Sequence, residues 1–496
     1  MTAVMILATL QAIAGAFDLF FHHETTERLT WKASAQTELR LHAVRNGLYA
    51  VLFLVLGWAE PHGFWAVAFL LVLLAEIVVT LCDFVVEDRT RQLPESERVL
   101  HTLLAVSYGA FLALLAPHLI GWLALPSAFH LVERGIWSPV MTVFALGVAL
   151  WAVRDGLRAR AVAATKPSPA PLVSRYLCPQ RVLVTGGTGF IGTRLCQALV
   201  AAGHDVTVLT RDPRKARHLP MPIRIATSCE SIVSDTQFDA VVHLAGASVA
   251  AGRWTAHRKA VLLASRIDTA HDLVALIGRL KHRPRVLISA SAIGFYGSDS
   301  AAALTESDAA RPGFAHDMCA RCETAARKAS RFGVRVVSMR LGLVLAAHGG
   351  PLGAMLPAFE FGTGARMGDG RQWMSWIHLD DVVRAVAFLI ARDDLRGPFN
   401  LTAPEPVTQG VFAARLATIL RRPCLFVLPA VLIHLVLGEM GNELLLASRR
   451  VLPKRLTDAG FVFQWGSLDG ALHDVLATNP SNPHDRKAAK VMPTTV

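Results

Sequence analysis

Long apolar runs alternate with short polar connections over the first third of the chain. The runs cover roughly 1–21, 44–59, 64–82, 99–123 and 137–153. Most are long enough to cross a ~30 Å hydrocarbon layer as helices, and the second lengthens if its helix begins near residue 34. The first run lacks a basic leader and a small-residue cleavage site, which argues against a cleavable signal. The pattern predicts an α-helical membrane bundle of about five transmembrane helices over residues 1–160. A buried soluble bundle is the alternative.

Basic side chains are concentrated in alternate connections of this bundle. Ten Lys and Arg residues follow the first, third and fifth runs, whereas the other two connections contain only Arg134. By the positive-inside rule, the N-terminus lies outside and everything beyond the fifth run is cytoplasmic. We therefore predict an integral protein of the inner or plasma membrane that has the lipid bilayer as a partner.

The predicted bundle also contains ionisable side chains at helical spacing. Residues four apart form three carboxylate–histidine pairs: Asp18 and His22, Glu38 and His42, Glu97 and His101. Intramembrane ionisable groups are functional candidates by default. Interfacial caps with ion pairs, a proton-coupled pocket and a metal site all fit the pattern. We assign no metal from the sequence, and the residues to consider if one binds are Glu38, His42, Glu97 and His101.

Glu76, Asp83 and Glu87 lie on one stripe of the third run, seven and four residues apart. Glu76 is about 10 Å deeper than Asp83 at ~1.5 Å of rise per residue. We predict that the Glu76 side chain faces other helices and not lipid.

A different pattern begins after residue 160. The stretch 161–179 is rich in Ala, Pro and Ser and predicts a semi-extended linker. Short strand-like runs then alternate with helical ones, at 182–185, 205–209, 223–226, 240–244, 286–289 and 334–340. This alternation predicts an α/β Rossmann fold with a doubly wound parallel sheet at 180–400. We place a smaller C-terminal substrate lobe at 401–478 and a disordered tail at 479–496.

The first of these strands ends in closely spaced glycines, and a helical pattern follows them. Gly186 permits the tight turn, Gly189 lets the backbone approach a pyrophosphate, and Gly192 allows the helix to pack on the strand. The anion would lie at the helix N-terminus. After the fourth strand, small residues let the backbone run under the cofactor. The predicted cofactor contacts are Gly186, Gly189, Phe190, Ile191, Gly192, Arg211, Leu244, Ala245 and Gly246.

Arg211 follows the second predicted strand, where dinucleotide selectivity is decided. An acidic residue here binds the ribose 2′-hydroxyl of NAD, whereas an arginine accommodates the 2′-phosphate of NADP. Arg211 therefore predicts NADP(H). A solvated loop arginine is the structural alternative, and Asp212, one position further on, keeps NAD(H) in consideration.

The fifth predicted strand leads into Ser289-Ala290-Ser291 and then Tyr296-Gly297. The chain here resembles the extended short-chain dehydrogenase/reductases, and more closely their atypical epimerase-like subgroup, the cell-division-inhibitor homologues. The resemblance covers about 181–476 and implies a nicotinamide cofactor on the Rossmann half and a small molecule between the two halves. The segments that carry it include Gly252-Arg253-Trp254, Ser265-Arg266, Gly349-Gly350, Gly368-Asp369-Gly370-Arg371-Gln372-Trp373, Ser375-Trp376-Ile377-His378-Leu379-Asp380-Asp381 and Phe399-Asn400-Leu401-Thr402-Ala403-Pro404.

The sequence departs at the expected catalytic helix from ordinary short-chain dehydrogenase/reductases, whereas the resemblance implies that the atypical subgroup shares the Cys and Glu found there. Ordinary members use a Tyr-x-x-x-Lys pair, in which the tyrosine exchanges the proton and the lysine lowers its pKa. None of the four tyrosines has a lysine four positions later, and Cys319 and Glu323 stand where the pair is expected. Glu323 would raise the pKa of a neighbouring thiol. Ordinary helix residues are the alternative for Cys319, and a cleft-lining role is the alternative for Tyr296.

The catalytic candidates are Ser291, Tyr296 and Cys319. Ser291 would hydrogen bond a substrate oxygen, and Tyr296 would serve as a substitute acid. Ser289 is an alternative to Ser291. Arg253, Arg340 and Arg371 fall at loop or switch positions that suit an anionic ligand.

Composition narrows the partners. The formal net charge is +12, but no basic run is interleaved with aromatic residues, so we expect no nucleic-acid partner. Seven scattered cysteines do not form a disulfide framework, which favours a reducing compartment.

We interpret the chain as a membrane-anchored NADP(H)-binding oxidoreductase or epimerase-like protein acting on an unknown small molecule, anionic or lipid-like. The alternative is a non-catalytic dinucleotide-sensing regulator coupled to its membrane domain. A third hypothesis has NADPH reducing a centre near His42 and His101. The sequence leaves the oligomeric state open.

Overall fold

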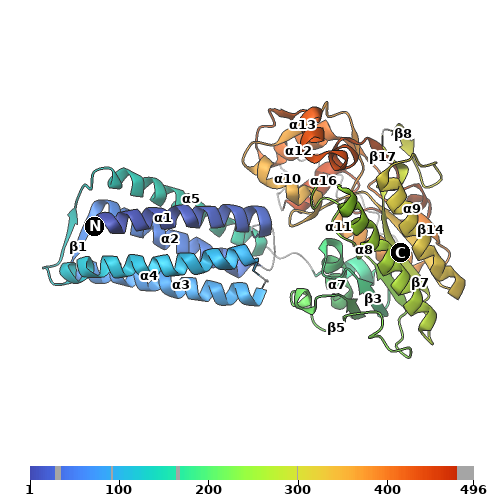
Figure 1. The fold of residues 1–496 in the computed structure, drawn as a ribbon, viewed down its shortest axis with the longest axis horizontal. Helices are drawn as coiled ribbons and strands as arrows, with labels where there is room; N and C mark the ends of the chain where they lie inside the picture. Colours follow the sequence, from blue (N-terminus) through green and yellow to red (C-terminus); the bar gives the residue numbers. More distant parts are fainter. Residues whose placement is uncertain (28, 30–34, 91–92, 164–167, 299, 477–496) are drawn as a thin grey trace, which may run out of the picture. The chain divides into compact units, whose positions relative to one another are not determined.

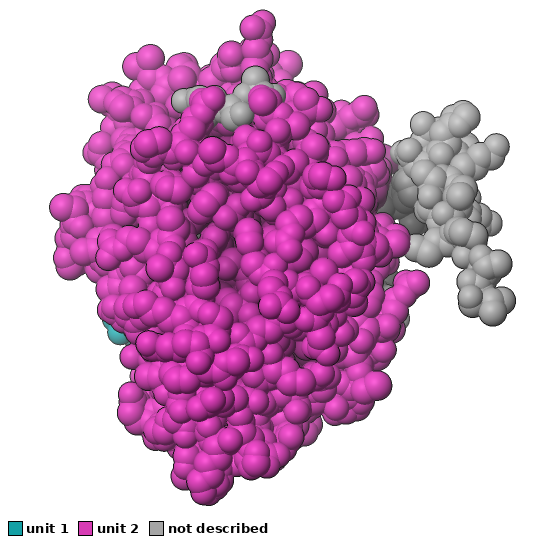
Figure 2. Space-filling view, turned by 90° about the vertical axis from the view of Figure 1, so that its right-hand side faces the viewer, with its two compact units in different colours: residues 1–165 teal, residues 166–496 magenta. Residues whose placement is uncertain are grey.

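The computed structural model describes residues 1–27, 29, 35–90, 93–163, 168–298 and 300–476 (Figure 1). The chain divides into two compact units, Met1–Thr165 and Lys166–Val496. Figure 2 colours the two units in space-filling form and shows mainly the surface of the second. The predicted tail at 479–496 lies outside the described residues.

Five long helices build the first unit: α1 (Thr2–Asp18), α2 (Gln36–Trp58), α3 (Phe64–Thr90), α4 (Glu95–Leu123) and α5 (Trp137–Ala163). They correspond to the five predicted runs, and within the described residues all five are long and apolar enough to cross a membrane. A short antiparallel ribbon, β1 (Ala59–His62) with β2 (Ala128–Leu131), joins two connections at one end of the bundle (Figure 1). Large apolar side chains such as Leu71, Val106 and Leu150 remain exposed on the outside of the bundle.

The first helix does not keep α-helical geometry to its end. A π-helix, η1 (Leu19–Glu27), continues directly from α1. Backbone hydrogen bonds in a π-helix run from i to i+5, so residues five apart return to the same face. This change of period places Asp18 and His23 one turn apart on the face that points into the bundle, where both are buried.

The second unit contains a seven-stranded parallel sheet in the order β14-β9-β7-β6-β3-β4-β5. Six of its strands were predicted from the sequence, and β14 was not. The strands are β3 (Arg181–Thr185), β4 (Asp205–Leu209), β5 (Ile223–Ala226), β6 (Ala240–His243), β7 (Val286–Ala292), β9 (Arg335–Leu341) and β14 (Gly397–Leu401).

Helices cover both faces of this sheet. The core on one face contains α7 (Phe190–Ala201) and α11 (Leu379–Ala391). The core on the other contains α8 (Ala256–Arg279) and α9 (Phe314–Arg327). The chain leaves the neighbouring strands β3 and β6 toward opposite faces, which makes their carboxyl ends a topological switch point where open α/β sheets bind ligands.

The remaining elements include four helices that lie together in the upper part of the second unit in Figure 1, α10, α12, α13 and α16. Their bounds are Gly350–Glu360, Gln409–Leu420, Ala430–Leu437 and Leu468–Val475. Short strands pair as β8 (Ser300–Leu304) with β17 (Arg449–Val451), β10 (Leu343–Leu345) with β13 (Trp376–His378), β11 (Ala365–Met367) with β16 (Phe426–Leu428), and β12 (Trp373–Met374) with β15 (Val407–Thr408). Short helical segments are η4 (Pro213–Ala216), η5 (Ile293–Tyr296), η6 (Lys328–Phe332), α14 (Glu439–Gly441), η7 (Asn442–Leu446) and α15 (Lys454–Asp458).

Part of the predicted linker is folded. The short helix α6 (Pro171–Ser174) belongs to the second unit, and its Val173 is fully buried in the core against the sheet. Tyr176 packs at the edge of the same core and accepts a hydrogen bond from Arg384 at 3.1 Å. Apolar residues spaced among the prolines therefore anchor this stretch, which differs from the semi-extended tether that composition predicted.

Candidate functional site

The glycine turn between β3 and α7 has the close backbone approaches that its sequence predicted. Gly186 has φ +70° and a Cβ there would lie 2.7 Å from the carbonyl carbon of Leu244. A Cβ on Gly192 would lie 2.1 Å from the Gly186 carbonyl oxygen. Because neither position accommodates a side chain, strand, turn and helix pack tightly and direct the amino end of α7 toward the carboxyl edge of the sheet. This is the arrangement that cradles a pyrophosphate.

The other predicted turn residues lie beside this cradle. Phe190 and Ile191 open α7, and the Phe190 ring abuts Gly349 and Gly350, where added Cβ atoms would approach to 2.5 and 2.7 Å. Arg194, one turn further along α7, forms a bidentate ion pair with Asp380 of α11 at 2.6 and 2.8 Å. These contacts fix the helix whose N-terminus would face the phosphates.

The loop after β6 is held against the turn by a buried histidine. His243 Nδ1 is 2.7 Å from Thr185 Oγ1, and this hydroxyl accepts a hydrogen bond from the backbone N–H of Ala245 at 3.3 Å. Leu244 donates its backbone N–H to the Thr185 carbonyl. Burial lowers the pKa of His243 to about 4, so the imidazole is neutral at pH 7. The predicted contacts Leu244 and Ala245 are thus placed next to the glycine turn.

Arg211 and Asp212 are used differently by the loop after β4. Arg211 is exposed just beyond the carboxyl end of the strand. Asp212 caps η4, because its carboxylate accepts the backbone N–H of Arg214 at 3.1 Å, and it also pairs with the Arg214 guanidinium at 3.2 Å. The acidic side chain therefore stabilises the loop, while the Arg211 guanidinium is accessible to a ligand.

A buried ion pair lies at the carboxyl end of β7 and β9. Glu323 of α9 accepts two hydrogen bonds from Arg340 of β9, at 2.9 and 3.0 Å, and both side chains are 3% exposed. Ser291 donates its hydroxyl to the same carboxylate at 2.9 Å. The cation beside Glu323 is therefore an arginine that is already bound to its carboxylate.

Tyr296 is part of the same network but faces away from solvent. Its hydroxyl donates to Asn400 Oδ1 at 2.8 Å and accepts from Arg340 at 3.0 Å, and the residue is 2% exposed. Burial raises the pKa of Tyr296, although Arg340 and Asn400 oppose the shift. This placement favours a structural role, and the role of substitute acid stays a prediction.

Cys319 lies on α9 beside the end of β7. It is buried, and Ser291 is its hydrogen-bonding neighbour. Burial raises the pKa of the Cys319 thiol, with a further contribution from Glu323, and contacts with Ala292, Ser291 and Arg266 lower it less. The thiol is therefore protonated at pH 7, which makes it a hydrogen-bond donor and a poor base.

Two contributors to the site received no role from the sequence. Arg266 of α8 donates to the Ala247 carbonyl at 2.9 Å, and a Cβ on Gly246 would lie 3.0 Å from its guanidinium carbon. The positive charge of Arg266 also lowers the pKa of the Cys319 thiol. The other contributor is the pairing of Arg340 with Glu323. The segment Ser265-Arg266 was noticed only as part of the family resemblance, and an ion pair between a helix and a strand leaves no local pattern.

The three arginines that were predicted to converge on an anion make separate contacts within the second unit. Arg340 is buried with Glu323. Arg253 donates to the Leu435 carbonyl at 3.3 Å, and Arg371 follows the turn capped by Asp369. His378 caps α11 by accepting the backbone N–H of Asp380, and it stacks on Trp465 with ring centres 3.9 Å apart.

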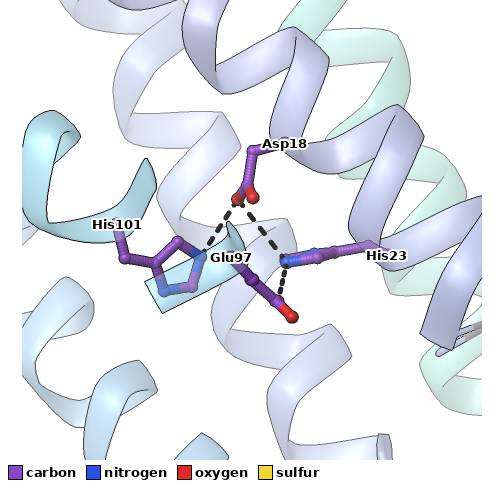
Figure 3. Close-up of side chains that lie close together, drawn as sticks. All are labelled: Asp18, His23, Glu97 and His101. Carbon is purple, nitrogen blue, oxygen red and sulfur yellow. Dashed lines mark hydrogen bonds and ion pairs between the residues drawn. The ribbon is translucent and has the colours of Figure 1, made fainter. Parts of the chain in front are cut away.

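A second polar cluster lies inside the bundle of the first unit, where the structure brings together more residues than the sequence predicted. Glu97 and His101 of α4 meet Asp18 and His23 of the first helix (Figure 3). His42 of α2 belongs to a neighbouring group with His23 and Glu87, whereas Glu38 is buried outside both groups. Glu76 is 2% exposed, which confirms that its side chain faces other helices of the bundle.

Comparison with known proteins agrees with this geometry. Residues 182–401 match the model of the NAD dependent epimerase/dehydratase family, and residues 428–475 match a domain of unknown function, DUF1731. An epimerase family protein of Staphylococcus epidermidis is 37% identical over 299 residues, which are 60% of this chain and 99% of the relative. The chain belongs to the epimerase family. A Mycobacterium tuberculosis member is 39% identical over 292 residues, 59% of this chain and 96% of its own.

Solved structures share the fold of the second unit. A human epimerase family protein crystallised with NADPH is 29% identical, has a TM-score of 0.54 and covers 60% of this chain and 99% of its own. A UDP-glucose 4-epimerase of Thermotoga maritima, with 20% identity and a TM-score of 0.50, covers 62% of this chain and all of its own, and shows the fold alone. The family assignment confirms the predicted nicotinamide dinucleotide cofactor and the Rossmann-like sheet.

Proposed function

We propose that this epimerase-family protein binds NADP(H) at the glycine turn and acts on a small polar molecule at the carboxyl ends of β6, β7 and β9. The observation that carries the proposal is the Gly186–Gly192 cradle at the switch point of the sheet, where no Cβ fits. The human relative crystallised with NADPH supports the same cofactor class. Bound NADPH supplies a hydride donor. The side chains of this protein select the cofactor and bind and orient the small molecule.

Arg211 is the basis for choosing NADP(H) over NAD(H). Its guanidinium is exposed beyond the carboxyl end of β4, where an arginine accommodates a ribose 2′-phosphate. Asp212 supports the same choice, because its carboxylate is engaged by the backbone and side chain of Arg214. Both contacts are made to Oδ1, so one oxygen of the acidic side chain already serves the loop.

The polar groups near the nicotinamide end favour binding and orientation of a small molecule. Ser291 and the Cys319 thiol offer hydrogen bonds at the end of β7. Arg266 supplies positive charge beside Gly246. Of the three catalytic candidates, Ser291 is the best placed to contact substrate, since it is partly exposed whereas Tyr296 and Cys319 are buried.

A non-catalytic dinucleotide sensor is the second proposal, and one observation favours it. Glu323 stands where the resemblance places the lysine of ordinary dehydrogenases, and its charge is compensated by Arg340. A site without a free cation beside a proton donor lacks the usual means of proton exchange. In this case binding of the cofactor would regulate the protein and its membrane domain, and the bound cofactor would be neither oxidised nor reduced.

We further propose that the five helices anchor the protein in a membrane with the N-terminus outside and the Rossmann unit in the cytoplasm. Their length and composition support spanning, and the asymmetry of Lys and Arg supports the orientation. The predicted substrate, anionic or lipid-like, and the absence of a nucleic-acid partner stay proposals.

The test uses the full chain purified in detergent. NADPH binding is measured by the change in its fluorescence for the wild type, for Gly192→Ala and for the matched control Gly466→Ala. An alanine Cβ at 192 would meet the Gly186 oxygen at 2.1 Å, whereas one at 466 has ordinary contact at 3.6 Å. We expect Gly192→Ala to lose binding at least tenfold and the control to keep it. Equal binding by all three proteins refutes the site.

Turnover separates the two proposals. Oxidation of bound NADPH by any member of a panel of carbonyl compounds, at a rate that Ser291→Ala lowers, supports the enzyme. Tight binding with no oxidation by any of them supports the sensor.

A further inference from the structure

Four side chains at one end of the helical bundle point toward a common centre. They are Asp18, His23, Glu97 and His101, all buried, and they offer one ligand atom each within 4.8 Å of one another (Figure 3). Nothing in the dinucleotide site uses them.

The distances between these atoms match the edges of a small coordination sphere. Asp18 Oδ2 is 3.1 Å from His101 Nε2 and 3.6 Å from His23 Nε2, and His23 Nε2 is 3.3 Å from Glu97 Oε1. Ligands about 2.0–2.2 Å from a tetrahedral ion are separated by roughly 3.4 Å. Two imidazoles and two carboxylates form a donor set suited to divalent first-row transition metals.

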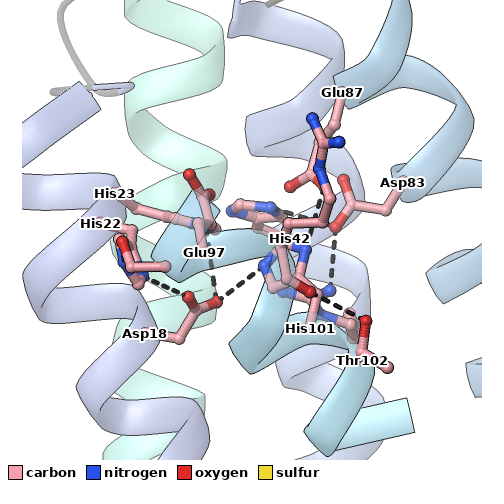
Figure 4. A network of polar contacts seen from close by, with 12 residues as sticks. Asp18, His22, His23, His42, Asp83, Glu87, Glu97, His101 and Thr102 are labelled. Atoms are coloured by element: carbon pink, nitrogen blue, oxygen red, sulfur yellow. Dashed lines mark hydrogen bonds and ion pairs between the residues drawn. The ribbon is translucent and has the colours of Figure 1, made fainter. Parts of the chain in front are cut away.

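The surrounding side chains hold the ligands in place. Asp18 Oδ1 is bound by His22 Nδ1 at 2.8 Å, and the other nitrogen of His22 contacts Ser96 at 3.1 Å. These two contacts leave Oδ2 of Asp18 directed at the centre of the four ligand atoms. On the far side, Arg45 donates to Asp83, and Asp83 pairs with His42 at 3.1 Å, next to His23 and Glu87 (Figure 4). Outer partners of this kind orient the ligands of metal sites.

The local backbone supports the same conclusion. Asp18 and His23 converge because η1 is a π-helix, whose i to i+5 period brings them to one face. Such segments are rare and occur frequently at functional sites. In a continuous α-helix His23 would turn away from Asp18 by about 140°, at 100° per residue.

Charge gives a third argument. The described part of the first unit fully buries eight carboxylates and four histidines, and no Lys or Arg among its described residues is buried to the same degree. Two partly exposed arginines pair with three of these carboxylates: Arg45 with Asp83, and Arg154 with Glu24 and Asp155. Buried charges are paired or coordinate metals, because desolvation otherwise costs several kcal/mol or more. A divalent cation offsets the excess of carboxylates.

We propose that Asp18, His23, Glu97 and His101 bind one divalent transition-metal ion within the helical unit, and that His22 positions Asp18. This site is independent of the dinucleotide proposal, because its four ligands and His22 all belong to the first unit.

The experiment uses the full chain in detergent, stripped with chelator and reloaded with Co²⁺, which absorbs in the visible range when bound by nitrogen and oxygen ligands. After desalting we expect about one equivalent of Co²⁺ by elemental analysis. His101→Gln and Glu97→Gln should each weaken Co²⁺ affinity at least tenfold, and His22→Gln should weaken it by roughly 10-fold through Asp18. Zn²⁺ added in excess should displace the Co²⁺ signal.

The matched control is His118→Gln, on α4 but at the opposite end, where its Nε2 contacts the N-terminal amine at 2.9 Å. It should retain full Co²⁺ binding. Circular dichroism and NADPH binding of each variant show whether the chain is folded. Substoichiometric Co²⁺ in the folded wild type, or equal binding by the folded ligand variants, overturns the proposal and leaves an ion-pair network. Unfolded ligand variants make the His22→Gln affinity, compared with His118→Gln, the deciding measurement.

Discussion

Arg340 of β9 binds both carboxylate oxygens of Glu323 of α9, at 2.9 and 3.0 Å, at the carboxyl ends of β7 and β9. The arginine also lies over the Phe295 ring at 3.4 Å and donates to Tyr296. One guanidinium therefore joins a helix, a strand and a turn. Because its charge is compensated, the pair stabilises the site more than it polarises a substrate.

Removing this cation should destabilise the second unit. In Arg340→Met the Glu323 carboxylate stays buried without its partner, which costs about 3–5 kcal/mol. The double variant Glu323→Leu/Arg340→Met should recover much of this loss, because no charge is left unpaired. Hydrogen–deuterium exchange of β7 and β9 measures the change. A single variant that exchanges as slowly as the wild type would show that the pair contributes little.

The Cys319 thiol should be slow to react at neutral pH. Burial and Glu323 raise its pKa, so the thiolate, which is the nucleophile, is scarce. We expect N-ethylmaleimide at pH 7 to modify the exposed Cys178 quickly and Cys319 only after denaturation, as judged by peptide mass spectrometry. If both cysteines react at the same rate in the folded protein, Cys319 is neither shielded nor protonated.

His243 should make the second unit less stable in acid. Its folded pKa, about 4, lies below its ordinary value of 6.5. Between these values the unfolded chain binds the additional proton, so stability is fully present above pH 6.5 and is lost as the pH falls toward 4. The shift corresponds to roughly 3 kcal/mol.

Exchange protection of β6, corrected for the intrinsic pH dependence of exchange, measures this loss. His243→Gln should flatten the dependence between pH 6.5 and 4, whereas the control His282→Gln, at an exposed position, should leave it unchanged. An unaltered slope in His243→Gln would assign the acid sensitivity to other groups.

Arg211→Ala should weaken NADPH binding at least tenfold and NADH binding little. The guanidinium gains a charge-assisted contact only from a 2′-phosphate, which NADH lacks. Arg224→Ala is the matched control, because Arg224 lies on the adjacent strand β5 and pairs with Asp205 at the amino end of β4. Titration of fluorescence gives both affinities. Equal losses for the two cofactors would contradict the assignment of NADP(H).

Local patterns in the sequence determined the five apolar helices, six of the seven sheet strands and the glycine turn. Each of these elements has a pattern contained within about 5 to 25 consecutive residues. The pattern is an unbroken apolar run, a strand–turn–helix order or a spacing of glycines. The missed strand, β14, begins with Gly397 and Pro398, which argue against a strand. It lies at the edge of the sheet, where proline is tolerated, and only pairing with β9 reveals it.

Tertiary structure alone decided the contacts that give these elements their chemistry. The pairing of Glu323 with Arg340 joins a helix and a strand, and the burial of Val173 depends on a core that α6 does not itself contain. A 3.6-residue period connected Asp18 to His22 and overlooked His23, because the switch to a π-helix has no signature in residue type. Side chains converge through distances between elements, and these distances are set by packing of the whole unit and not by neighbours along the chain.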